Sequence, residues 1–254
     1  MTPVLEIAGL RKQFGGIVVA NDVNLAIKKD EVVGLIGPNG AGKTSLFNIV
    51  SGLIPHDAGT VILNGQPIER LSMHARARLG LTRTWQNIRL FPSLSVLDNL
   101  IVAPRYYPGE SILRAAFSPG RLRDQRKKIT ERAYNQLEKV RLVDAATRFP
   151  TELSYGKQKL VSIARALMND GDCLLLDEPI AGVEGAAYEA LKNVIRSEAK
   201  LGRAICIVEH NISFVRDLCD RVLFMFNGKI LNSGTMDELM ARDDLAGLYF
   251  GSET

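Results

Sequence analysis

Cysteine and long apolar runs are both scarce in this sequence. The 254 residues include three cysteines, Cys173, Cys206 and Cys219, an odd number without a C-x-x-C spacing. They indicate neither a disulfide framework nor a zinc site, and their apolar neighbours predict core positions. No apolar run approaches the roughly 18 residues of a membrane span, and residues 1–14 lack the basic start and apolar stretch of a signal peptide. We therefore expect a cytoplasmic protein that does not span a membrane.

Net charge is also low. The chain has 32 Lys and Arg against 28 Asp and Glu, and 46% of its residues are hydrophobic, which is typical of a soluble protein with a full core. The charge is uneven, because residues 104–132 hold eight basic and three acidic residues. Such a window either faces nucleic acid, anionic lipid or an acidic partner, or is the solvated face of a charged helix.

The apolar pattern predicts an α/β protein. Short segments rich in Val and Ile predict an antiparallel sheet from strands at residues 4–7, 17–27 and 60–64. Continuous apolar runs predict buried strands at residues 173–176, 204–208 and 222–226. Tyr188, Leu191, Ile195 and Ala199 have the spacing of one helix face between the first two of these runs. Strand, helix and strand in succession indicate a parallel sheet.

The middle of the chain is different. From residue 98 to residue 166 helical periodicity continues without a convincing strand, and a loop rich in proline and tyrosine opens the basic window near residue 104. We predict one domain whose α/β core comprises residues 1–86 and 167–254, with a helical subdomain at residues 87–166.

A glycine-rich pattern follows the apolar run at residues 32–36. It reads Gly37-Pro38-Asn39-Gly40-Ala41-Gly42-Lys43-Thr44, and Ser45 comes next. Glycines let the backbone turn its N–H groups toward phosphate oxygens, and a following helix adds its positive N-terminal end. Lys43 would reach the β- and γ-phosphates, and the Thr44 hydroxyl would bind Mg²⁺. These residues predict a nucleotide site that opens a helix over residues 43–52.

Two carboxylates, Asp177 and Glu178, follow the apolar run at residues 173–176. Ligands bind at the carboxyl ends of strands in open α/β sheets. Adjacent side chains at a strand end point in different directions, so they suit different roles. We assign Asp177 to a link with Mg²⁺ and Glu178 to polarising a water in line with the γ-phosphate.

Two further polar residues are candidates. His210 follows the apolar run at residues 204–208 and would sense the γ-phosphate. Gln86 leads from the α/β core toward the helical lobe and would bind Mg²⁺ or water as the lobe moves. Its neighbour Trp85 is predicted to pack, and His56 and His74 are expected on the surface.

The segment Leu153-Ser154-Tyr155-Gly156-Lys157-Gln158 resembles the L-S-G-G-Q signature of the ATP-binding cassette superfamily, and the resemblance extends over nearly the whole chain. It implies that Phe14 stacks on adenine, that Gln86 belongs to the Q-loop, that Glu178 is the catalytic glutamate and that His210 is the switch histidine. It also implies that Ser154 and Gly156 bind ATP held by a second subunit, in a head-to-tail dimer with two ATP molecules. Residues 82–91 and 208–211 are similar to those of branched-chain amino-acid importer ATPases, a subfamily that Tyr155 also fits.

Departures from the family pattern occur at three places. Lys157 stands at the usual glutamine of the signature, and Phe14 replaces a more common tyrosine at little cost. In the D-loop, which belongs to the nucleotide site, Glu184 replaces the usual aspartate and Gly185 replaces the usual proline. The longer acid Glu184 on the freer backbone of Gly185 would weaken communication between the two ATP sites, which predicts slower or less cooperative hydrolysis.

The resemblance implies an importer ATPase at the cytoplasmic face of the membrane. Its partners would be a second cassette, identical or not, membrane permease subunits and, indirectly, a periplasmic or extracellular substrate-binding protein, with no nucleic acid. Three alternatives stay open: a lipopolysaccharide-exporter ATPase, a soluble cassette protein that binds ribosomes or DNA, and a nucleotide-binding regulator without hydrolysis. The transported molecule is not specified by the sequence.

Overall fold

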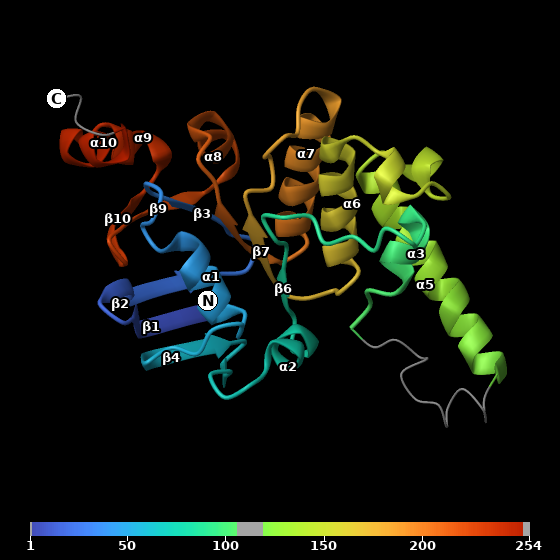
Figure 1. Ribbon diagram of the computed structural model, residues 1–254, viewed down its shortest axis with the longest axis horizontal. Helices are drawn as coiled ribbons and strands as arrows, with labels where there is room; N and C mark the ends of the chain where they lie inside the picture. The colour runs from blue at the N-terminus through green and yellow to red at the C-terminus, as the bar shows by residue number, and fades with distance from the viewer. Residues whose placement is uncertain (1, 106–118, 251–254) are drawn as a thin grey trace. The chain divides into compact units, whose positions relative to one another are not determined.

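The computed structural model of the chain describes residues 2–105 and 119–250 (Figure 1). The strands are β1 (Leu5–Phe14), β2 (Ile17–Ile27), β3 (Val32–Ile36), β4 (Ala58–Leu63), β5 (Gln66–Pro67), β6 (Leu81–Arg83), β7 (Cys173–Asp177), β8 (Ala204–Val208), β9 (Arg221–Phe226) and β10 (Lys229–Gly234). The helices are α1 (Lys43–Val50), α2 (Met73–Arg78), α3 (Val96–Ile101), α5 (Pro119–Lys139), α6 (Tyr155–Leu167), α7 (Ala186–Lys200), α8 (Ile212–Leu218), α9 (Met236–Met240) and α10 (Asp243–Phe250). Within the described ranges, no helix combines the length and apolar character needed to cross a membrane.

Two compact units divide the chain. The first, here called the core unit, consists of Met1–Arg83, Asp172–Pro179 and Ile195–Thr254. The second, here called the helical unit, consists of Thr84–Gly171 and Ile180–Val194.

The core unit contains the two sheets that the sequence predicts. A four-stranded antiparallel sheet has the order β2-β1-β4-β5, and a six-stranded sheet has the order β10-β9-β3-β8-β7-β6. Strands β9, β3, β8, β7 and β6 run parallel, and β10 closes one edge in the antiparallel direction. The α/β fold class is therefore confirmed.

The two faces of the six-stranded sheet contribute to different apolar clusters, because successive side chains along a strand point to opposite faces. Leu35 and Leu223 point into the cluster that contains α1 and the antiparallel sheet. Ile36 and Phe224, each one residue further along, join the cluster of α8, α9 and α10. Strands β3, β7 and β8 are buried throughout their length, and their residues are apolar except for Gly34 and Asp177, as is typical of parallel strands inside a sheet. This burial fixes the strand ends from which the site residues project.

Helix α1 ends at Val50, two residues before the predicted glycine stop, and a buried arginine satisfies its end. Arg76 Nη1 donates to the carbonyl oxygens of Ile49 and Val50, both at 2.8 Å. Its other nitrogens bind the carbonyls of Glu69 and Leu71 at 3.0 Å. The last carbonyls of a helix lack partners within it, so a cation here is favoured by hydrogen bonding and by the helix dipole.

The helical unit is built from α3, α5, α6 and the first part of α7, and its described residues contain no strand, as the sequence predicts. The predicted periodicity is confirmed on α5, where Ala133 and Leu137 are fully buried. On α7 the buried residues Leu191, Ile195 and Ala199 follow the predicted spacing. Residues 106–118 of the basic window lie outside the described residues. At its other end, residues 123–128 of α5 are exposed, which agrees both with a solvated face and with a surface that meets a partner.

Candidate functional site

The glycine-rich loop lies between β3 and α1, where close backbone approach excludes side chains. Gly37 and Gly42 have positive φ angles of 148° and 106°. A Cβ at Gly37 would overlap the Met225 carbonyl oxygen, and a Cβ at Gly42 would overlap that of Val19. At Gly40, by contrast, a Cβ would meet nothing within 4 Å. The base of the loop is packed too tightly for side chains, whereas its tip at Gly40 has open space beside it. This arrangement suits a loop whose backbone N–H groups bind phosphate oxygens.

Lys43, the first residue of α1, folds back over this loop. Its Nζ donates to the carbonyl oxygens of Gly37 at 2.7 Å and Pro38 at 2.9 Å. Burial lowers the pKa of the ammonium group below its usual value, and the charges of Glu178 and Asp177 oppose this effect. A cation is thus held at the place where phosphate charge would have to be neutralised.

The two predicted carboxylates occupy different surroundings. Asp177 ends β7 and is 1% exposed, whereas the Glu178 side chain is 22% exposed. Glu178 has a φ of 46°, in the left-handed region, and its N–H donates to the Val208 carbonyl at 2.9 Å. The backbone therefore turns at Glu178, which separates its side chain from that of Asp177.

His210 follows β8, the strand beside β7, and approaches Glu178. Its Nε2 lies 3.5 Å from Glu178 Oε1. The backbone N–H of His210 donates to the buried carboxylate of Glu209 at 3.0 Å. Burial lowers the pKa of His210 below 6.5, the Lys43 charge lowers it further, and Glu178 opposes both. The imidazole is therefore neutral at physiological pH.

These residues come together because β3, β8 and β7 are neighbours whose carboxyl ends coincide. Leu35 and Asp177 both pair with Val208 in register. Ligands bind at this edge of open parallel sheets. Thr44 is exposed on the first turn of α1, and its hydroxyl and the Asp177 carboxylate are oxygen ligands of the kind Mg²⁺ prefers, so the donor set fits that metal.

Phe14 ends β1 with 46% of its surface exposed. The Lys12 ammonium group lies 5.0 Å from the centre of its ring, and Lys12 also pairs with Asp57 at 2.7 Å. Asp57 accepts the Gln13 N–H at 2.8 Å as well, so the strand end that carries Phe14 is fixed. An exposed, held aromatic ring is suited to stacking on a base.

The signature segment belongs to the helical unit. Ser154 is the N-cap of α6, and its hydroxyl accepts the Lys157 N–H at 3.5 Å. A Cβ at Gly182 would lie 2.7 Å from the Tyr155 ring, and one at Gly156 would lie 3.0 Å from the Gly182 carbonyl oxygen. The signature residues therefore pack on the segment that carries Glu184, which is itself exposed.

Gln86 is also in the helical unit, with an exposed side chain. The buried Lys159 of α6 donates from Nζ to the Gln86 carbonyl oxygen at 2.7 Å. Trp85 is partly buried and stacks against Arg89, whose guanidinium carbon lies 4.3 Å from the ring centre.

Sequence reasoning missed Lys159 and also Arg83, which ends β6 and donates to Asp177 Oδ2 at 2.9 Å. Each binds a partner far away in the sequence, 94 residues for Arg83 and 73 for Lys159, so no local pattern pointed to it. The cysteines, by contrast, are inert: Cys173 and Cys206 are buried and Cys219 is largely so, and burial raises the pKa of the Cys206 thiol to about 12.

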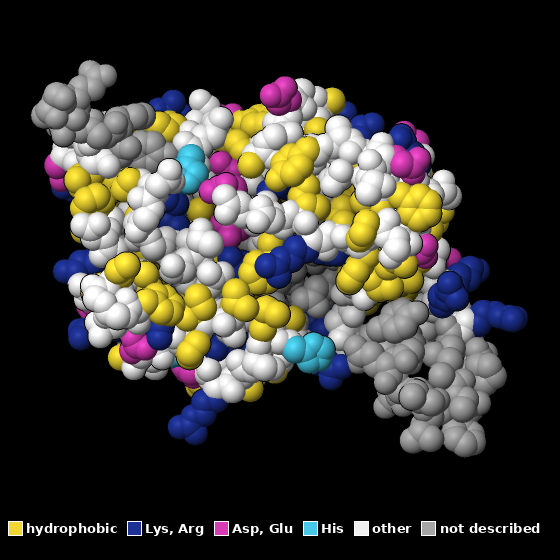
Figure 2. Space-filling model, in the orientation of Figure 1, with side chains coloured by type: hydrophobic (Ala, Val, Ile, Leu, Met, Phe, Trp, Pro, Cys, Tyr) yellow, Lys and Arg dark blue, Asp and Glu magenta, His cyan; other side chains and the backbone are white. Residues whose placement is uncertain are grey.

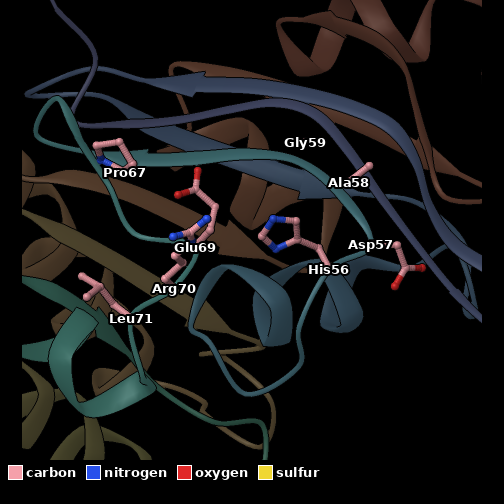
Figure 3. A pocket seen from close by; sticks show the side chains of 8 residues that line it. All are labelled: His56, Asp57, Ala58, Gly59, Pro67, Glu69, Arg70 and Leu71. Atoms are coloured by element: carbon pink, nitrogen blue, oxygen red, sulfur yellow. The ribbon is translucent and has the colours of Figure 1, made fainter.

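A cavity of about 460 Å³ lies on the antiparallel sheet (Figure 3). Its polar lining includes Glu69 and the partly buried His56, whereas His74 is exposed. Glu69 accepts the Val61 N–H at 2.8 Å, so it supports the sheet. The lining contains none of the predicted site residues. On the face drawn in Figure 2, the Lys and Arg side chains of the coloured residues are scattered among other types.

Comparison with known proteins gives concordant results. The family model described as "ABC transporter" matches residues 20–181. The high-affinity branched-chain amino acid transport ATP-binding protein BraF of Pseudomonas aeruginosa is 35% identical over 252 residues, covering 98% of both chains. LivG of Escherichia coli K12, with the same description, is 33% identical over 98% of both chains. The lipopolysaccharide export system ATP-binding protein LptB of Haemophilus influenzae is 32% identical over 98% of both chains.

Solved structures show the same fold. The ADP conformation of MJ1267, an ATP-binding cassette of an ABC transporter, superposes with a TM-score of 0.85 and 29% identity, covering 99% of this chain and 100% of the other. The dimeric structure of MJ0796, a bacterial ABC transporter cassette, has a TM-score of 0.77 at 24% identity, covering 91% and 98%.

Proposed function

The chain belongs to the ABC transporter family as a nucleotide-binding ATPase, and from this premise we propose that it energises amino-acid import through separate membrane subunits. The observation that carries the proposal is whole-length similarity to two proteins named for branched-chain amino acid transport, at 35% and 33% identity. Branched-chain amino acids are therefore the first substrates to test.

In the proposed site, the loop Gly37–Gly42 and Ser45 hold the phosphates, Lys43 neutralises their charge and Phe14 stacks on adenine. Glu178 takes the proton of the attacking water, and its turned backbone and partial exposure leave it able to reach solvent. His210 contacts Glu178 and donates to the γ-phosphate through its neutral imidazole.

We assign the metal site to Thr44, Asp177 and Gln86. Mg²⁺ bound there would neutralise charge on the β- and γ-phosphates. Asp177 is held in one orientation by its ion pair with Arg83, and Thr44 is fixed by the first turn of α1.

A second cassette would complete each ATP site with Ser154, Gly156 and Glu184. Ser154 is the N-cap of α6, a helix whose first backbone N–H groups and dipole favour an anion. The proposed unit is a dimer, identical or mixed, attached to permease subunits at the cytoplasmic face of the membrane and supplied by an external substrate-binding protein.

Lipopolysaccharide export is the second candidate, favoured by 32% identity over the whole length of LptB. The two functions differ in the membrane subunits they need. A purification of the E178Q variant from membranes of the source cell, with ATP present, would retain those subunits for identification.

The uptake experiment uses a strain that lacks the gene. We expect uptake of labelled leucine, isoleucine or valine to fall and to recover with the wild-type gene but not with E178Q. Normal uptake together with loss of surface lipopolysaccharide would favour export instead. Recovery of ribosomes or DNA with no permease subunit would overturn both transport proposals, and absence of ATP turnover would leave only a regulator.

A further inference from the structure

Arg83 is a buried cation that joins two parts of the core unit. Its side chain is 5% exposed, and its Nη2 donates to Asp177 Oδ2 at 2.9 Å. Its Nη1 donates to Asn48 Oδ1 at 2.7 Å and to Ser51 Oγ at 3.1 Å. The guanidinium carbon also lies 5.6 Å from the centre of the Phe47 ring. One side chain from β6 therefore holds both the end of β7 and helix α1.

The two residues to which Arg83 donates hydrogen bonds, Asn48 on α1 and its C-cap Ser51, lie on the same face as Thr44. Asn48 and Ser51 are four and seven residues after Thr44, positions that lie above one another on an α-helix. The guanidinium group of Arg83 thus bridges Asp177 and this face. Because α1 is anchored by two side-chain hydrogen bonds, the link constrains rotation of the helix as well as its position.

We propose that Arg83 is a positioning residue that fixes the Asp177 carboxylate relative to Thr44, so that both oxygens are preorganised for one metal ion. This inference rests on the proposed roles of Asp177 and Thr44 in the metal site. Arg83 does not itself touch the metal or the nucleotide; it acts through Asp177 and α1.

The chemistry of the guanidinium group explains why arginine stands here. Its planar fork presents several N–H donors in fixed directions, which allows simultaneous bonds to a carboxylate, an amide and a hydroxyl. It also supplies the charge that a carboxylate with 1% exposure requires. Lysine would keep the charge but, as a compact ammonium group on a flexible stem, would lose the fixed geometry.

A purely structural role makes a different prediction. Arg76 is the matched control, because it is also a buried arginine that binds α1, but through the carbonyls at the helix end. If burial and helix support were all that mattered, R83K and R76K would reduce stability without changing metal affinity. Only a positioning role separates the two variants in their metal dependence.

The test measures Mn²⁺ affinity for the protein–ADP complex by electron paramagnetic resonance, with melting temperature and metal-free ADP affinity recorded on the same samples. We expect R83K to weaken Mn²⁺ binding roughly 10- to 100-fold, the range for partners that orient metal ligands. Metal-free ADP affinity should be unchanged, and the Mg²⁺ concentration that half-saturates hydrolysis should rise by a similar factor. R76K should keep wild-type Mn²⁺ affinity.

Unchanged Mn²⁺ affinity in R83K, beside a weakened D177N, would overturn the role of Arg83 and leave the metal site intact. Unchanged affinity in D177N would instead overturn the proposed metal site, and this inference with it. R83M serves as a second variant that removes the charge; if it also binds Mn²⁺ normally while melting earlier, Arg83 is only structural.

Discussion

His210 Nε2 lies 3.5 Å from Glu178 Oε1, although the two residues follow different strands of the sheet. The contact directly joins the proposed general base to the proposed γ-phosphate sensor. Neither side chain is deeply buried, at 39% and 22% exposure, so both are accessible to a substrate at the sheet edge. Substitution of Glu178 tests its role in activity, and substitution of His210 tests its effect on stability.

We expect E178Q to lower ATP turnover by roughly 10²- to 10⁴-fold, the usual contribution of a positioned base. Glutamine keeps the size of the side chain but cannot accept the proton of the attacking water. ATP affinity should be retained, and size-exclusion chromatography with ATP should reveal an accumulated dimer. E131Q, at an exposed position on α5, is the control and should turn over ATP normally. Full hydrolysis by E178Q would remove Glu178 from the role of general base.

A second prediction concerns pH. The pKa of His210 in the fold is below 6.5, so protonation favours the unfolded chain. Its contribution to stability is complete above pH 6.5 and is lost as pH falls through the lowered folded pKa. Between about pH 7.5 and about pH 5.5, wild type should therefore lose more melting temperature than H210Q. Parallel pH profiles for the two proteins would show that His210 does not titrate in this way.

Local patterns were sufficient to predict most of the strands, the phosphate loop and the carboxylate pair, but they missed β5, β6, β10 and the second half of β1. Each depends on residues adjacent in the chain, such as the buried run that ends at Asp177 or the glycines before Lys43. The merging of these segments into one site followed from a general property of parallel sheets, because β3, β8 and β7 end at the same edge. The chemical roles of these residues stay predictions.

The supporting cations could not be predicted, because their partners are distant in the sequence. Arg83 binds an acid 94 residues away, Lys159 a carbonyl 73 residues away and Arg76 a carbonyl 27 residues away. No period or motif encodes such contacts. The same limit applies to Gly185: its difference from a family proline was visible, but its φ of 58°, which proline cannot adopt, was not.

The cap formed by Arg76 provides a prediction about stability. R76M keeps most of the apolar stem but leaves the carbonyls of Ile49 and Val50 without their cation. We expect a loss of roughly 3 kcal/mol, because hydrogen bonds from charged donors are strong and these acceptors are buried. For a chain of this size the melting temperature should fall by roughly 6 to 12 °C. R70M, at an exposed position nearby, should melt like wild type, and an equal fall in both would refute the cap.

Lys159 and Lys157 form a matched pair on α6 for testing the contact with the Q-loop. Lys159 is buried and holds the Gln86 carbonyl, whereas Lys157 is exposed. K159M should increase hydrogen exchange of backbone amides at residues 84–91 by about tenfold or more, since a charge-assisted bond is lost. K157M should leave exchange there unchanged, and amides of the phosphate loop serve as the internal reference. Equal protection in both variants would mean that Lys159 does not restrain this segment.

Gly182 and Gly185 form a second matched pair, in the segment that packs on the signature residues. Both have positive φ angles, 69° and 58°, so alanine should cost roughly 1 kcal/mol of backbone strain at either position. Only at Gly182 would the new methyl group meet the Tyr155 ring, at 2.7 Å, whereas at Gly185 it would meet nothing within 4 Å. G182A should therefore reduce both the melting temperature and ATP turnover more than G185A, because displacing Tyr155 disturbs the start of α6. Identical behaviour of the two variants in both measurements would show that the contact between Gly182 and Tyr155 does not hold the signature segment in place.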